Sequence, residues 1–585
     1  MTETHPDSLY PLNPITAEII RHALLAIPNQ IDVNITRTAY SPLVYEYKDY
    51  AVGITDPEGR LIAQGQGGIP IFMANSLSVA VKDGLAVHGR ESMQPGDVFI
   101  CNHSSVLGQH LNNVAMYCPV FVEGELAAFM CVLVHWIDVG GMVVGSCSVD
   151  STEIAQEGLQ FRSIRLWRAG EPCRDIYSII ESNTRVPRML FGDIQAQLSG
   201  CLLGCEMLEK LIAKYSVSTF RAAVARMWDR SEAAARAAIR RIPDGRYEAH
   251  SFLDNDGLDL DRRLPLDIAV IVCGDEMTVD LSGVAPQVRG SINSGREGGA
   301  VTVARIAFMF LVAPEDPANE GSFRPLRIEV PEGTFLSARP GAAMGLYSPP
   351  LPSAIDTITR ALVEAMPDKA AAGHHGNFAI HSVTGRDPKT GEVFVNIATG
   401  IGGWGAMRGQ DGAGPYKTMA HGDTPDVPAE AQEALFPLNI DSIGLRTDSG
   451  GAGEFRGGLG IEKTFTALAP CQLKLSFDRT GCPPWGILGG KEGAAPQVVI
   501  ERAGKPPETR FKGIFALQRG DRVLVKTSGG GGYGDPLGRA PERVARDVRL
   551  GYVSRECARA DYGVALDDEG AVLSEVTARL RSEGT

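Results

Sequence analysis

The sequence predicts a mixed α and β protein (α+β) with several domains and a glycine-rich, β-containing C-terminal half. At 585 residues the chain has room for several domains of about 100–200 residues each. Segments with helical periodicity alternate with short runs that are typical of strands. Glycine supplies 67 residues, and the chain is especially glycine-rich after Gly376. We expect domains near 1–245, 246–370 and 371–585.

In the first of these regions, 1–245, the sequence pattern predicts one helix before and another after a group of strands. Apolar residues recur with helical spacing over 15–38 and again over 205–240. Alternating or apolar runs predict strands at 50–64 (a hairpin around Asp56–Gly59), 98–101, 114–121 and 126–135.

The pattern changes after the turn at 242–245. Residues 268–273 and 277–281 predict strands, and short strand-like segments continue from Gly376 to 535. Residues 540–562 return to a helical pattern, so we expect a peripheral helical tail.

Composition and charge exclude several classes of function. The chain has 56 Lys and Arg against 70 Asp and Glu, and a net charge of −14 opposes nonspecific nucleic-acid binding. The longest apolar stretches, 126–134 and 301–312, fall short of the roughly 18–20 residues of a membrane span. The opening residues lack the pattern of a secretory signal, and the 11 cysteines contain no CxxC pair. We therefore expect a cytoplasmic protein with reduced thiols.

The densest group of polar residues lies around two of the predicted strands. In chain order it comprises Asn102, His103, His110, Asn113, His135, Asp138 and the pair Gly140-Gly141. Two histidines at the ends of neighbouring strands can converge with a carboxylate on a divalent metal, which would then activate a water molecule. Histidines and aspartates in such loops can equally be satisfied polar groups, and their spacing alone leaves both interpretations open.

The glycine-rich segments do not predict a nucleotide site. Ser528–Pro536 resembles a phosphate-binding loop but lacks the Lys-Ser/Thr pair, and Arg456–Gly460 does not fit GxGxxG. Structural glycines with positive φ are the preferred explanation. A GxSxG nucleophile motif is also missing from the sequence. His374, His375 and Trp404 could line a pocket or pack against a sheet.

Several longer motifs occur in a fixed order along nearly the whole chain. They are Thr36–Pro42, Asp56–Gln64, Gly96–His110, Asp138–Met142, Thr152–Ile154, Gln156–Gly158, Gly192–Gln197, Phe323–Pro325, Gly402–Gly405, Asp448–Gly453, Pro483–Gly486 and Gly529–Pro536. Together they resemble the B-type subunits of the hydantoinase/oxoprolinase superfamily. Its relatives include N-methylhydantoinase, caprolactamase, the C-terminal part of 5-oxoprolinase and subunits of acetone and acetophenone carboxylases.

This resemblance implies a division of labour between two subunits. An A-type partner would bind ATP and phosphorylate the substrate, and the B-type subunit would complete the reaction at a divalent metal (Zn, Mn or Mg). The expected function is metal-assisted hydrolysis of a phosphorylated cyclic amide within a hetero-oligomer. The missing phosphate loop agrees with ATP being bound by the partner. The alternatives are a ketone carboxylase subunit or a noncatalytic structural subunit.

The resemblance also assigns residues to the metal site. The family ligands correspond to Asp49, His110, Asn113 and His135, and Asn113 replaces a family aspartate with a neutral oxygen donor. His103 could supply the lost ligand, which would favour zinc over manganese or magnesium.

Further positions are assigned by the same resemblance. Gly68, Phe72 and Trp136 stand at positions where the family carries polar residues. Asp138 is the candidate supporting carboxylate or general base, and Glu157 is a more remote candidate for catalysis.

Overall fold

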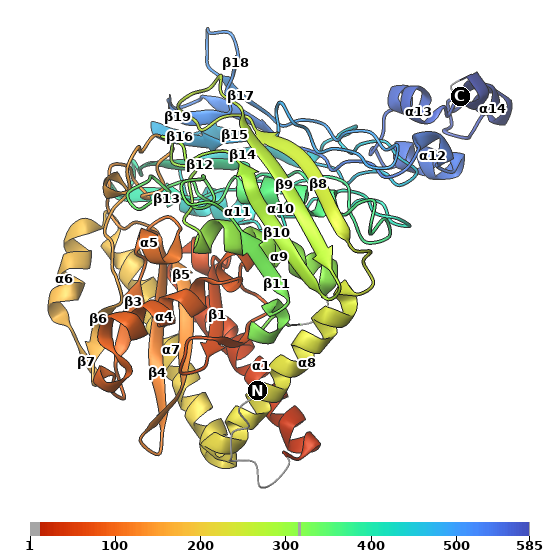
Figure 1. Ribbon diagram of the computed structural model, residues 1–585. Helices are drawn as coiled ribbons and strands as arrows, with labels where there is room; N and C mark the ends of the chain where they lie inside the picture. The colour runs from red at the N-terminus through yellow and green to blue at the C-terminus, as the bar shows by residue number, and fades with distance from the viewer. Residues whose placement is uncertain (1–11, 314–316, 584–585) are drawn as a thin grey trace.

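The computed structural model describes residues 12–313 and 317–583 (Figure 1). The opening segment, where the sequence predicts no secretory signal, lies largely outside the described residues. Over the described ranges, no helix combines the length and apolar character that crossing a lipid bilayer requires.

A seven-stranded antiparallel sheet forms the N-terminal part, in the order β2-β1-β5-β4-β3-β6-β7. Its strands are β1 (Tyr50–Thr55), β2 (Leu61–Gln64), β3 (Val98–Cys101), β4 (Asn113–Val122), β5 (Glu125–His135), β6 (Ile164–Arg168) and β7 (Glu171–Pro172). The predicted hairpin and the three predicted strands that follow it are confirmed.

Helices cover both faces of this sheet. α4 (Ser76–His88) brings Gly84 against Tyr117, while α7 (Pro187–Tyr215) brings Gly204 against Met130. Met130 lies opposite Cys118, the residue after Tyr117, so the two helices contact opposite faces. α1 (Pro14–Thr38) packs against α7 and agrees with the predicted helix.

The predicted helical stretch at 205–240 is two helices. α7 begins eighteen residues earlier, and α8 (Val217–Ile239) starts after Ser216, whose φ is 75°. The Ser216 hydroxyl accepts a hydrogen bond from the Thr219 N–H, and this cap lets the chain turn into the second helix. The remaining helices are α2 (Pro42–Tyr45), α3 (Pro70–Met73), α5 (Ser104–Leu107), α6 (Arg174–Asn183), α9 (Thr302–Val312), α10 (Leu351–Ala361), α11 (Ala429–Leu435), α12 (Pro541–Arg549), α13 (Arg555–Tyr562) and α14 (Ser574–Glu583).

Three further sheets follow along the chain. The middle sheet has the order β11-β10-β9-β8, with β8 (Gly245–Leu253), β9 (Leu264–Cys273), β10 (Glu276–Val284) and β11 (Leu326–Glu329). The two C-terminal sheets have the orders β13-β12-β16-β19 and β14-β15-β20-β17-β18. Their strands are β12 (Ile380–Arg386), β13 (Val393–Asn396), β14 (Leu438–Leu445), β15 (Ile461–Ala467), β16 (Cys471–Ser476), β17 (Gln497–Glu501), β18 (Glu508–Thr509), β19 (Lys512–Leu517) and β20 (Arg522–Lys526).

The apolar core is continuous across the first two regions and into the third. One cluster of buried residues extends from Ile20 to Val427, and a second lies between the two C-terminal sheets. The predicted domain boundaries stay a prediction. α12, α13 and α14 lie apart from the main body at the C-terminal end (Figure 1), where the sequence predicts a helical tail.

The glycine-rich C-terminal segments pack backbone against backbone. We call the four segments 402–406, 449–460, 485–493 and 528–532 the glycine bundle. The N–H groups of Gly530, Gly531 and Gly532 donate to carbonyls of Gly458, Gly373 and Lys491, and Gly451 donates back to Gly530. A Cβ on Gly530 would lie 1.9 Å from the Trp404 carbonyl oxygen. Close approach therefore requires glycine here. Positive φ, which the sequence predicts for glycines of Ser528–Pro536, occurs at Gly534 (72°) and at none of Gly529–Gly532.

Candidate metal centre

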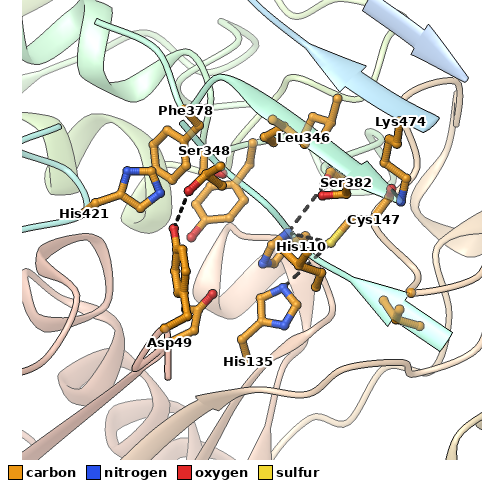
Figure 2. Close-up of a pocket in the computed structure, with 18 of the residues that line it drawn as sticks. Asp49, His110, His135, Cys147, Leu346, Ser348, Phe378, Ser382, His421 and Lys474 are labelled. Carbon is orange, nitrogen blue, oxygen red and sulfur yellow. Dashed lines mark hydrogen bonds between the residues drawn. The ribbon is translucent and has the colours of Figure 1, made fainter. Parts of the chain in front are cut away.

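A largely enclosed cavity lies between the N-terminal sheet and the C-terminal strands β12 and β16 (Figure 2). Its volume is about 60 Å³, several times what one water molecule requires. Figure 2 shows Asp49, His110 and His135 on the side of the N-terminal sheet and Phe378 and Leu346 across from them.

Apolar side chains dominate the rest of the wall. They are Ile69, Ile71, Phe72, Val144, Leu346, Phe378, Ile380, Val395 and Ile397. Such a lining keeps bulk water out and strengthens electrostatic interactions inside the cavity.

The N-terminal sheet places the two histidines. His135 ends β5, pairs with Asn113 across the strands, and donates its backbone N–H to the carbonyl of Asp49. His110 belongs to the turn that leads from α5 into β4. The two imidazole rings meet edge to face with 4.8 Å between centroids, and burial lowers the pKa of both. Both rings therefore stay neutral near pH 7, as metal ligation requires.

A third donor, Cys147, comes from the loop after β5. Its Sγ lies 3.4 Å from His110 Nδ1 and 3.8 Å from His135 Nε2. One atom from each of the three residues lies within 4.8 Å of the others, which is compatible with shared coordination of one ion. No motif in the sequence predicts this residue as a ligand.

Two buried polar atoms in this region lack partners among the described residues: Asp49 Oδ1 and His135 Nδ1. Burial raises the pKa of Asp49 to about 7, although His110 and Lys417 act in the opposite direction. An unpartnered buried carboxylate is costly unless a cation or donor reaches it. These atoms, together with the cluster, make the cavity fit a divalent metal.

Asn113 and His103, predicted as ligands, occupy other positions. Asn113 does not line the cavity; its Oδ1 bonds to His110 Nε2 at 2.8 Å, and its Nδ2 donates to Gln109 and Tyr347. His103 caps α5, with its Nδ1 2.8 Å from the hydroxyl of Ser105. It is not part of the cluster that contains His110. Asn113 therefore orients His110, and His103 lies apart from the donors.

The two carboxylates predicted for catalysis hold loops that border the cavity. Asp138 pairs with Arg185 at 3.0 Å and accepts the N–H groups of Gly140 and Gly145. Glu157 Oε1 accepts from Ser151 and from the N–H groups of Met344 and Gly345. Burial raises the pKa of Glu157 to about 7. Neither side chain belongs to the cavity wall. Their catalytic roles stay predictions.

Lys474 enters the cavity from the C-terminal part of the chain. It lies on β16, lines the wall, and donates through Nζ to the backbone carbonyl of Cys147. Burial lowers its pKa, and charge on Cys147 opposes that shift. No local motif could have predicted this contact, because the two residues are 327 positions apart.

The other positions singled out in the sequence divide between this cavity and its surroundings. Phe72 lines the cavity, whereas Trp136 is fully buried and donates to Gln197 Oε1. Gly68 lines a separate, more open hollow together with Trp404.

His374 and His375 are buried outside both hollows. His374 Nδ1 lies 3.5 Å from Asp356, which pairs with Arg479. His374 and His375 are therefore packed inside the protein and do not line either hollow.

The hydantoinase B/oxoprolinase family matches residues 13–536. The chain belongs to this family. It is 28% identical to the B-type component of a putative D-/L-hydantoinase from Pseudomonas sp. (strain NS671), over 99% of this chain and 100% of that protein. It is 31% identical to the beta subunit of caprolactamase from Pseudomonas jessenii, over 97% and 98% of the two chains.

Solved structures share the fold of this hydantoinase B/oxoprolinase family member. The ATP-dependent caprolactamase from Pseudomonas jessenii has a TM-score of 0.89 at 29% identity, covering 98% of this chain and 100% of that chain. Nucleotide-free acetone carboxylase also has a TM-score of 0.89, at 19% identity, covering 98% of this chain and 83% of that chain. The second likeness shows the fold alone.

Proposed function

We propose that this chain is the B-type subunit of an ATP-dependent complex that opens a cyclic amide. An A-type partner would phosphorylate the amide oxygen, and this subunit would complete the hydrolysis. The observation that carries the proposal is the enclosed cavity in which His110, His135 and Cys147 converge beside the unpartnered Asp49. Two relatives, of hydantoinase and caprolactamase, are named as single subunits of those enzymes, which supports the two-subunit arrangement.

The chemistry explains why ATP is needed. An amide carbon is a poor electrophile, and transfer of a phosphoryl group to its oxygen supplies a leaving group. One water molecule then adds to the carbon, and the ring C–N bond breaks to give an acyl phosphate and the ring-opened amine. A second water molecule hydrolyses the acyl phosphate to the carboxylate and free phosphate. In balance, one ATP and two water molecules give ADP, phosphate and the ring-opened amino acid.

The residues of this chain have separate roles in that reaction. A divalent metal held by the histidines and neighbouring donors would lower the pKa of a water molecule toward about 7. Asp49, with its pKa raised to about 7, is suited to bind that metal or to take a proton at neutral pH. The apolar wall would contact the methylene groups of the ring and exclude competing water.

Asp138 and Glu157 would act by positioning, because each binds the backbone of a loop that borders the cavity. The free state of all eleven cysteines agrees with the cytoplasm, where ATP is available to the partner. We place the complex there.

Ketone carboxylation is the second candidate, and the apolar cavity favours it. Phe72 and the surrounding aliphatic side chains make a dry site, and a carboxylase must keep water from an activated intermediate.

One assay separates the two candidates. The chain would be copurified with its A-type partner and incubated with ATP and a panel of lactams, hydantoins and 5-oxoproline. We expect ADP release coupled to ring opening. His110→Ala should abolish the ring-opened product, whereas the exposed His22→Ala should not. Incorporation of ¹³C-bicarbonate into a ketone, with no ring opening, would instead support carboxylation.

Unchanged activity in an assembled His110→Ala complex would contradict both enzymatic proposals. That result would support a structural role for this chain.

A further inference from the structure

We propose that Cys147 is a thiolate ligand in this chain and that the site is consequently selective for zinc. The inference rests on the metal use proposed above and names a donor that the sequence did not predict. Four features of the geometry support it: the spacing of the cluster, the hydrogen bonds of Asn113, the unpartnered nitrogen of His135, and the anchoring of the loop that carries Cys147.

The spacing of the three donors suits a tetrahedral zinc ion. With zinc–sulfur bonds of about 2.3 Å and zinc–nitrogen bonds of about 2.0–2.1 Å, sulfur and nitrogen ligands lie about 3.5 Å apart. The Cys147 Sγ lies 3.4 Å from His110 Nδ1 and 3.8 Å from His135 Nε2. An ion could therefore be held with only small side-chain movements.

The hydrogen bonds of Asn113 direct His110 toward Cys147. His110 Nε2 lies 2.8 Å from Asn113 Oδ1, so Nε2 carries the proton and Nδ1 keeps its lone pair. Histidines that bind metals commonly donate their other N–H to an oxygen in this manner. Nδ1 also lies 3.4 Å from the Gly345 carbonyl, which is longer than an ordinary hydrogen bond. Asn113 thus serves as a partner of the ligand, where the sequence suggested a ligand.

His135 adds an independent sign that a ligand belongs here. The residue is buried, and its Nδ1 has no partner within the part of the chain that the structure describes. Among the same described residues, the Cys147 sulfur is the one hydrogen-bond partner near its Nε2. A neutral imidazole left with so few hydrogen bonds in an apolar wall is unfavourable unless something binds it.

Two contacts fix the loop that carries Cys147. Asp138 accepts the N–H of Gly145, and Lys474 Nζ donates to the carbonyl of Cys147. Lys474 makes no ion pair with a carboxylate in the described ranges, so its amine lies beside Cys147 without a fixed anionic partner.

The sulfur donor determines which metal is preferred. Thiolate and imidazole suit zinc, whereas magnesium and manganese prefer carboxylate, carbonyl and water oxygens. Binding would release the thiol proton, leaving sulfur to donate its electron pair to the ion. Three protein ligands leave a fourth position open, as in catalytic zinc sites. Asp49, which lies outside the three-residue cluster, would remain free to act on substrate.

Cobalt(II) provides the test because it replaces zinc and absorbs in the near ultraviolet when a thiolate binds it. The whole chain, stripped by chelator, would be titrated with cobalt(II) alone. We expect about one cobalt per chain and a thiolate charge-transfer band. Cys147→Ser should lose the band and weaken zinc binding by more than the roughly 10–100-fold that loss of an outer partner costs. Cys173→Ser, at a partly buried cysteine outside the cavity, should keep both.

A further variant guards against misfolding. Cys147→Asp should bind one metal without the band and should shift preference toward manganese, while metal-free Cys147→Ser should unfold at the wild-type temperature. Stoichiometric cobalt binding without a band, or a band that survives in Cys147→Ser, would overturn this inference and leave the proposed metal enzyme intact. Wild-type protein that binds no cobalt would contradict both.

Discussion

The glycine bundle and the candidate metal cavity differ in whether their buried polar groups find partners. In the bundle, neighbouring segments supply hydrogen bonds to one another's backbone, and the lack of side chains allows that approach. In the cavity, Asp49 and His135 keep buried atoms without partners among the described residues. Satisfied backbone groups make the bundle a rigid support, whereas the unpartnered atoms of the cavity are available to a ligand. The most conspicuous sequence motif is therefore structural, and the site depends on less conspicuous residues.

The largest effect should come from adding one methyl group to the glycine bundle. Gly530→Ala would place a Cβ 1.9 Å from the Trp404 carbonyl oxygen, which cannot move without disturbing the next segment. We expect a loss of at least about 4 kcal/mol in the free energy of unfolding, or no folded protein. Chemical denaturation followed by circular dichroism measures it.

Gly444→Ala is the matched control, because a Cβ there meets no atom within 4 Å. It should change the free energy of unfolding by less than about 1 kcal/mol. A Gly530→Ala protein as stable as this control would show that the bundle tolerates side chains and that its glycines have another purpose.

Glu157→Gln tests whether a buried carboxyl group beside the cavity makes the stability of the protein depend on pH. Burial raises the pKa of Glu157 from 4.5 to about 7 in the folded protein, so ionisation opposes folding. The stability that the folded protein gains from a protonated Glu157 is fully present below pH 4.5. It is lost as the pH rises from 4.5 through about 7. The glutamine variant cannot ionise, so between pH 5 and pH 8 it should gain about 2–3 kcal/mol relative to wild type.

Urea denaturation at the two pH values measures this difference. The exposed Glu171→Gln is the control and should follow the wild type at both. If Glu157→Gln also followed the wild type but lost ring opening, Glu157 would be a catalytic group, as the sequence suggested, and its positioning role would be wrong.

The sequence predicted the parts of this molecule that depend on local pattern. The hairpin, the strands before the cavity and the first helix follow from periodicity over a few residues. The break between α7 and α8 was missed because it depends on the backbone of a single serine, Ser216.

The candidate site was predicted only in part, because its contacts join distant positions. His135 ends β5 and His110 lies in the turn that enters the neighbouring β4, so their convergence could be expected. Cys147 follows a glycine-rich loop whose path depends on Asp138, Arg185 and Lys474, and no spacing rule encodes that path. The role of His103 as a ligand stays a prediction; in the structure its side chain caps α5, a local contact that its spacing from His110 does not reveal.

The central claim is that this cavity holds a metal, and elemental analysis tests it most directly. The chain would be purified without chelator beside His110→Ala, His135→Ala and the exposed His22→Ala, and metal content measured by inductively coupled plasma mass spectrometry. We predict about one zinc per chain in wild type and His22→Ala, with loss from both cavity variants. Metal-free wild-type protein, or metal content unchanged in both cavity variants, would contradict the account.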